Sequence, residues 1–218
     1  MLGELKLELP ASQLCFTGWD FEGIDKYPVE IGVTIFKEGN LHRGFFSRLF
    51  APKDLIIPAK SPMFGYDLHK NQDSPKLWEL WPQLSSYWQV HCFVGHNIGT
   101  ERKYLHAFPL HPAPAWLDTL KLFRFAYPHL PSHTLGDLLR EFQLVEKTKE
   151  FCKTTIQEEV SEHNPLYDAA GCLLLLNYLL NQPGWEQVTL SQLQSLKPEI
   201  YYKNRKRSSP TYRFQRSF

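Results

Sequence analysis

The sequence lacks the features that mark membrane, secreted and zinc-ribbon proteins. It has no apolar run of about 18 residues, so it predicts no transmembrane helix. Residues 1–10 carry charged side chains and show no signal-peptide core. The four cysteines form no Cys-x-x-Cys pair, which leaves a zinc ribbon or a redox motif without support. We therefore expect reduced thiols, a cytoplasmic location and no membrane partner.

Acidic residues are missing from the C-terminal end. The overall charge of +1 combines +6 from residues 201–218 with −5 from the remainder. Aromatic residues alternate with these cations, a composition that suits phosphate contact and base stacking on single strands. The alternative is a solvated chain end. We expect a domain over 1–190 and a basic, aromatic tail over 191–218. The expected tail contacts to nucleic acid are Lys203, Arg205, Lys206 and Arg207.

Three segments in the first quarter of the chain have the composition of β-strands. An apolar run from residue 14 leads to the acidic residues at 20 and 22, and β-branched and apolar runs follow at 29–36 and 44–50. Their connections are short, which predicts an antiparallel meander. An irregular, proline-rich loop at 51–75 and a helix over 76–88 are expected next.

Strands that alternate with helices follow. Residues 90–94 and 115–117 predict two short strands, and Asn97 is the expected N-cap of a helix that reaches residue 106. A short helix over 134–142 and a mixed helix and loop segment over 145–162 come next. A helix starting at Asn164 and Pro165 is apolar on nearly all sides and ends at 181–184. This order predicts an α/β fold, a mixed sheet with helices on its faces.

The residues that organise the chain are Asp20 and Glu22, at the end of the first strand. Side chains alternate along a strand, so these two carboxylates point the same way. They would raise each other's pKa, and a hard divalent cation relieves that repulsion. An Asp-x-Glu pair by itself is more often a solvated surface feature. The apolar strand before it favours a place at the edge of the core.

Two further acids and a histidine follow at similar positions. Glu101 and Asp168 each lie four residues after an expected N-cap, where the helix dipole favours a negative charge. Each alone is most simply a dipole-favoured acid of the first helical turn. His163, just before the last long helix, is most simply a surface or capping residue. Together with Asp20 and Glu22, they form a candidate site.

The order of these residues resembles the DEDDh 3′→5′ exonucleases, a family that includes the proofreading subunits of bacterial replicases and ribonuclease T. The resemblance rests on Asp20-x-Glu22, His96-Asn97-x-x-x-Glu101 and His163-x-x-x-x-Asp168. It covers most of the chain. Further matching segments lie at 28–33, 94–97, 117–120 and 133–138.

The resemblance implies a ribonuclease H-like fold with helices on both faces of the sheet. It also implies a metal-dependent 3′→5′ exonuclease that releases nucleoside 5′-monophosphates from single-stranded DNA or RNA. Two Mg²⁺ or Mn²⁺ ions, about 3.5–4 Å apart, would assist an in-line displacement at phosphorus. Several members dimerise, so a homodimer is among the expected assemblies.

The resemblance also assigns roles to residues. The implied metal ligands are Asp20, which bridges both ions, Glu22, Asp168 and, through a water, Glu101. His163 is the implied general base. The implied substrate-binding residues are Gly23, Ile24, His96 and Asn97. Ile24 would contact the last base, and a core isoleucine is the equally weighted alternative.

Two departures from the family pattern leave other functions open. The family usually has Asp where this chain has Glu101, and two threonines between the Glu and Gly of the first motif, where Glu22 and Gly23 are adjacent here. A weakly active or inactive nucleic-acid-binding module is therefore one alternative. An endonuclease of the ribonuclease H type is another, and the placement of His163 argues against it. The sequence does not separate DNA from RNA.

Overall fold

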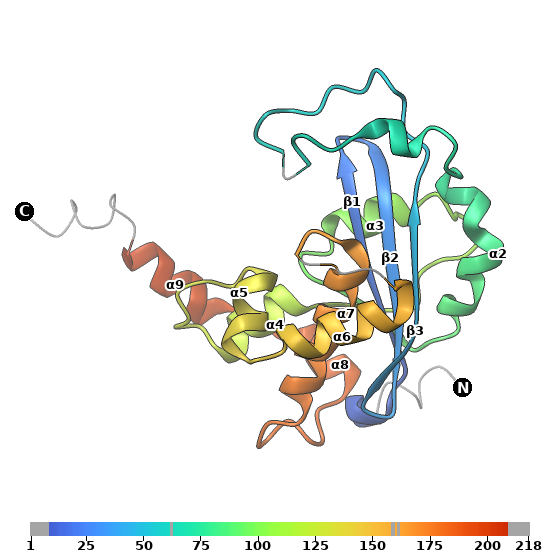
Figure 1. The fold of residues 1–218 in the computed structure, drawn as a ribbon. Helices are drawn as coiled ribbons and strands as arrows, with labels where there is room; N and C mark the ends of the chain where they lie inside the picture. Colours follow the sequence, from blue (N-terminus) through green and yellow to red (C-terminus); the bar gives the residue numbers. More distant parts are fainter. Residues whose placement is uncertain (1–8, 62, 158–159, 161, 209–218) are drawn as a thin grey trace, which may run out of the picture.

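A five-stranded mixed sheet forms the centre of the computed structural model, which describes residues 9–61, 63–157, 160 and 162–208 (Figure 1). The strand order is β3-β2-β1-β4-β5. The strands are β1 (Phe16–Ile24), β2 (Tyr27–Lys37), β3 (Asn40–Arg48), β4 (Cys92–Gly95) and β5 (Trp116–Asp118). β1, β2 and β3 pair antiparallel, whereas β4 pairs parallel with both β1 and β5. The expected mixed sheet is confirmed.

One face of the sheet is covered by α7 (Pro165–Leu180), which contacts β1 and β2 extensively. Two glycines permit this close approach. A Cβ at Gly18 of β1 would collide with the backbone oxygen of Ala169, and one at Gly32 of β2 would collide with the Pro165–Leu166 backbone. The first turns of α7 therefore lie directly against β1 and β2.

The opposite face is covered by a cluster of aromatic residues and by short helices. Trp19 and Phe21, which alternate with Gly18 and Asp20 along β1, are buried there against Phe93 and Tyr104. The covering segments are η3 (Leu77–Leu80), α2 (Trp81–Leu84), η4 (Ser85–Trp88) and α3 (Gly99–Leu105).

The single helix expected over 76–88 is wrong, because this segment forms η3, α2 and η4 in succession. Pro82 lies in the first turn of α2. Proline has no N–H to donate to the preceding turn, so one continuous α-helix does not run through it.

The remaining helices lie mostly on the α7 side of the sheet and beyond its β5 edge (Figure 1). They are η1 (Ala11–Gln13), η2 (Leu68–Asn71), α4 (Thr119–Ala126), α5 (Leu135–Glu141), α6 (Val145–Ile156), α8 (Leu190–Ser195) and α9 (Glu199–Ser208). Helix α4 was not expected. It is capped by Asp118, whose Oδ1 accepts a hydrogen bond from the N–H of Leu120 at 3.0 Å. The segment 145–162, expected as a mixture of helix and loop, contains α6 up to Ile156, and its described residues beyond that helix are not helical.

Asn97 is not the N-cap of α3, which corrects the expectation. The cap is Ile98, and Asn97 has a left-handed backbone with φ 68°. Its N–H donates to Asp118 Oδ1 at 3.0 Å, so the turn after β4 is fixed by β5 before α3 begins. Asn164 does cap α7, because its Oδ1 accepts from the N–H groups of Leu166 and Tyr167.

The four cysteines are free thiols. In the described part of the chain, no helix has the length and apolar character that a bilayer crossing needs. The expected tail contains α9 up to residue 208, and its aromatic and basic residues from 209 onward lie outside the described residues. The domain boundary at residue 190 stays a prediction.

Candidate active site

Four carboxylates converge at the end of the sheet where β1 finishes. Asp20 and Glu22 lie on the same face of β1, opposite Gly32 and Glu30 of β2. Asp168 lies in the first turn of α7, which the close approach at Gly32 brings onto this face. Glu101, in the first turn of α3, is only 3% exposed and completes the cluster.

Burial and neighbouring charges raise the pKa of every carboxylate in the cluster. Burial, followed by the nearby Asp168, Glu101 and Glu22 carboxylates, raises the pKa of Asp20 well above its ordinary value. Burial raises the pKa of Glu22 to about 7 and that of Glu101 to about 7. Burial and the Glu22 charge raise the pKa of Asp168 to about 8. Four acids that each resist ionisation in one another's presence form a site that a cation would stabilise.

The donor set fits a hard divalent cation. Oε2 of Glu101 is buried and has no hydrogen-bond partner among the described residues. An unpaired buried oxygen of this kind costs free energy that a ligand recovers. Glu22, His163 and Asp168 each offer a ligand atom, and these atoms lie within 4.8 Å of one another. Carboxylate oxygens are the ligands that Mg²⁺ and Mn²⁺ prefer.

His163 stands at the mouth of the cluster. Its side chain is 67% exposed, and its Nδ1 lies 3.7 Å from Oε1 of Glu22. The backbone is left-handed, with φ 67°, and its N–H donates to Oδ2 of Asp168 at 3.2 Å. Asp168 thus holds the turn that carries His163. The exposed imidazole is accessible to a ligand that arrives from solvent.

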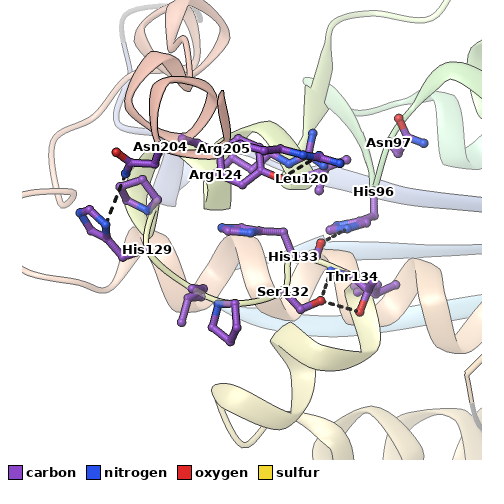
Figure 2. A pocket seen from close by; sticks show the side chains of 15 residues that line it. His96, Asn97, Leu120, Arg124, His129, Ser132, His133, Thr134, Asn204 and Arg205 are labelled. Carbon is purple, nitrogen blue, oxygen red and sulfur yellow. Dashed lines mark hydrogen bonds between the residues drawn. The ribbon is translucent and has the colours of Figure 1, made fainter. Parts of the chain in front are cut away.

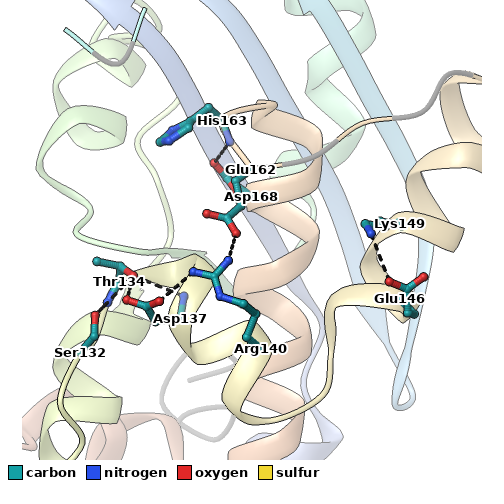
Figure 3. A network of polar contacts seen from close by, with 9 residues as sticks. All are labelled: Ser132, Thr134, Asp137, Arg140, Glu146, Lys149, Glu162, His163 and Asp168. Atoms are coloured by element: carbon teal, nitrogen blue, oxygen red, sulfur yellow. Dashed lines mark hydrogen bonds and ion pairs between the residues drawn. The ribbon is translucent and has the colours of Figure 1, made fainter. Parts of the chain in front are cut away.

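A polar network that the sequence did not reveal supports this turn (Figure 3). Arg140 of α5 pairs with Glu162, the residue before His163, and with Asp137 at 2.7 Å. Thr134 donates to Asp137 at 2.7 Å. A Cβ at Gly136 would collide with the Glu162 carboxylate, so this glycine makes room for it. The i, i+3 spacing of Asp137 and Arg140 was visible in the sequence, but their link to Glu162 was not.

Gly23 and Ile24 are the last two residues of β1, where Gly23 is half-buried and Ile24 is buried. Gly23 lies against the Tyr104 hydroxyl, which donates to the backbone oxygen of Asp25 at 3.2 Å. Ile24 is 3% exposed and packs with Val29 and other apolar residues. This is the environment that the core alternative describes, and contact of Ile24 with a terminal base stays a prediction.

His96 and Asn97 both follow β4, but their environments differ. Asn97 is exposed. Burial lowers the pKa of His96 to about 4, so the ring is neutral at pH 7. Its Nε2–H donates to the backbone oxygen of His133 at 2.9 Å, and its Nδ1 lies 3.0 Å from the Thr119 hydroxyl. The ring therefore ties β4, α4 and the 128–135 loop together, in addition to any contact with substrate.

The four expected tail contacts lie in different environments. Arg205 lines a cavity between α9 and α4, whereas Lys203 and Lys206 are exposed and are not among the residues lining it. The side chain of Arg207 lies outside the part of the chain that the structure describes.

Comparison with known proteins gives a clear result for the fold. Neither a family model nor a curated protein sequence matches the chain. Exonuclease X in complex with 5′-overhanging duplex DNA aligns with a TM-score of 0.61 and 21% identity, over 85% of this chain and 99% of that chain. Pop2p of S. pombe in its Mg²⁺- and Mn²⁺-bound form aligns with a TM-score of 0.57 and 14% identity, over 88% and 90%.

A 3′-exonuclease recognising the 3′ end of a histone mRNA stem-loop aligns with a TM-score of 0.52 and 9% identity, over 76% of this chain and 81% of that chain. Identities this low establish similarity of fold. The chain shares the fold of these structures, and the expected ribonuclease H-like fold with a mixed sheet is confirmed.

Proposed function

We propose that the chain is a metal-dependent 3′→5′ exonuclease that releases nucleoside 5′-monophosphates from single-stranded DNA, RNA or both. The observation that carries the proposal is the convergence of four carboxylates and one exposed imidazole where β1 and α7 meet. The fold neighbours support it, because their structures hold DNA, a histone mRNA stem-loop, or Mg²⁺ and Mn²⁺.

The chain's own residues suggest how a cation would be held. Asp20, Glu22 and Asp168 would provide the central ligands, and Glu101 would contribute directly or through water. Divalent cations in such a site polarise the phosphate and increase the acidity of a bound water. Because the raised pKa values leave the buried carboxylates partly protonated near pH 7 in the absence of a cation, cation binding would displace these protons.

His163 is assigned as the general base. Its Nδ1 lies nearest Glu22, and we assign Nε2 to accept the proton of the attacking water. The Glu22 carboxylate would stabilise the imidazolium that results. Exposure of the ring permits a phosphodiester to approach it, and the His163–Asp168 backbone hydrogen bond holds it beside the carboxylates.

A second candidate function is nucleic-acid binding without turnover. Glu101, which is longer than the usual Asp, and the shortened first motif favour it. Both functions predict binding to a nucleic-acid strand, so cleavage is the property that distinguishes them.

Degradation of 5′-labelled single strands tests the proposal. DNA and RNA with free or blocked 3′ ends would be incubated with Mg²⁺, Mn²⁺ or EDTA, with Asp20→Asn as the matched variant. We expect a metal-dependent ladder that shortens only from a free 3′ end and is lost in Asp20→Asn. Binding without cleavage in either metal would favour the binding module, and cutting of circular strands would favour an endonuclease.

A further inference from the structure

A second candidate site lies beside the carboxylate cluster, in a cavity of about 940 Å³ between α4, α9 and the 128–135 loop. We name it the α4–α9 cavity. Arg124 and Arg205 lie on one side, and Ser132 and Thr134 lie on the opposite side (Figure 2). Its volume falls in the range of about 300–1,000 Å³ that is typical of ligand pockets.

The charge of the cavity is of one sign. Its lining includes Arg124, Arg205 and three histidines, and no carboxylate. Among the described residues no acidic side chain forms an ion pair with either arginine. Two unneutralised guanidinium groups beside one cavity repel each other, and an anion between them removes that cost.

Arg124 is held by contacts that leave its charge uncompensated. Its guanidinium lies 4.7 Å from the centre of the Tyr201 ring, and its Nε is buried without a hydrogen-bond partner among the described residues. Arg205 donates to the Tyr201 hydroxyl at 3.2 Å. Tyr201 thus fixes both arginines at the cavity, and planar guanidinium groups suit phosphate oxygens.

The wall of the cavity is preorganised. His133 donates through Nε2 to the backbone oxygen of Tyr127 at 3.0 Å, and its own backbone oxygen accepts the hydrogen bond from His96. The His133 ring also contacts Tyr201 edge to face. These bonds tie the loop to β4 and α9, so the cavity exists without a ligand.

The cavity adjoins the candidate active site at the end of β4. His96 and Asn97 line it, and the preceding Gly95 lies against the backbone of Trp19 and the side chain of Glu101. On the other side, Thr134 lines the cavity and joins the Asp137–Arg140–Glu162 network. A nucleic-acid strand whose end lies at the carboxylates would reach the cavity by passing the end of β4.

We propose that the α4–α9 cavity is a phosphodiester-binding subsite for the substrate strand on the 5′ side of the cleaved end. The inference rests on the proposed function for the identity of that strand. Of the expected tail contacts, only Arg205 belongs to this subsite. The second contact is Arg124 of α4, which the composition of the tail did not indicate.

Binding of the full chain to single strands of about 3 to about 12 nucleotides, in EDTA to prevent turnover, tests the subsite. The variants are Arg124→Gln and Arg205→Gln. The matched controls are Lys121→Gln on α4 and Lys197→Gln just before α9, because both lysines are exposed and neither lines the cavity. Thermal melts would verify that each variant is folded. Arg205 is exposed, so its variant remains a test if Arg124→Gln does not fold.

We expect each arginine variant to lose roughly tenfold in affinity for the longer strands and to lower the salt slope by about 1. The controls should stay within about twofold. Equal losses in Arg205→Gln and Lys197→Gln would overturn the subsite and indicate diffuse attraction to the surface. Degradation by the wild type with no arginine effect would reject the subsite alone. A wild type that binds in this pattern but does not degrade strands would reject the exonuclease alone.

Discussion

Arg140 pairs with Glu162, and Glu162 directly precedes His163 in the chain. Because Arg140 also holds Asp137 on its own helix, the ion pair connects the turn that carries the candidate base to α5. Both side chains are partly exposed, so the pair contributes little to overall stability. The main effect of the Arg140–Glu162 pair is to position the turn that carries His163.

Breaking this pair should therefore lower turnover more than stability. For Arg140→Gln and Glu162→Gln we expect a roughly tenfold loss of kcat with little change in KM, because a misplaced base affects the chemical step. The matched control is Lys149→Gln, which removes an exposed ion pair to Glu146 on α6 (Figure 3). The double variant should lose no more than either single variant. Equal kcat in the wild type and in both single variants would remove the pair from the mechanism.

The variant His163→Ala distinguishes two roles of His163, general base and metal ligand, because the geometry permits both. As the base, its loss should reduce kcat by roughly 10²–10⁴-fold and leave cation affinity unchanged. Mn²⁺ titration followed by thermal melting, in parallel with turnover, measures both quantities. A large loss of Mn²⁺ affinity with His163→Ala would identify the imidazole as a ligand instead.

Gly32 should not tolerate a side chain, because a Cβ there would collide with the backbone at the start of α7. Backbone atoms cannot rotate away, so Gly32→Ala should destabilise the fold by about 1–3 kcal/mol and move Asp168 away from Asp20. Gly99→Ala is the matched control, since nothing lies within 4 Å of a Cβ there. Denaturant unfolding measures the difference. Equal stability of the two variants would contradict the close-approach argument.

Local chemistry explains which parts of the fold could be predicted from the sequence. The strands, the Asn164–Pro165 start of α7 and the shared face of Asp20 and Glu22 follow from periodicity and capping, which act within a few residues. The break of the 76–88 segment, which Pro82 imposes, could have been found by the same reasoning.

The parts that were missed depend on contacts distant in sequence. Asn97 looked like a cap, but Asp118 holds its N–H from β5. Arg124 lies in α4, a helix that was not predicted, and its place at the α4–α9 cavity depends on Tyr201. Glu162 looks like a surface acid until α5 folds against its turn. For the same reason, the motifs indicated which acids matter, whereas their burial and raised pKa values required the structure.

Stability without a cation should fall as the pH rises from about 6.5 to about 8. Glu22 and Glu101 have pKa values of about 7, and Asp168 has one of about 8, all above their ordinary values. The folded state therefore binds more protons than the unfolded state in this range, and each group's contribution is lost as the pH passes its folded pKa. His96, whose pKa is lowered by burial, acts in the opposite direction below about pH 6.5, so the window starts there.

A divalent cation should cancel this loss, because it takes the place of the protons on the ionised carboxylates. Thermal melts in EDTA, Mg²⁺ or Mn²⁺ at matched ionic strength would measure it, and the gain in Tm from the cation should be larger at about pH 8 than at about pH 6.5. The variant Glu22→Gln removes one of the titrating groups and should flatten the slope in EDTA. A metal-free Tm that rises through this window, or a cation effect that is independent of pH, would show that the four acids do not titrate as one buried cluster.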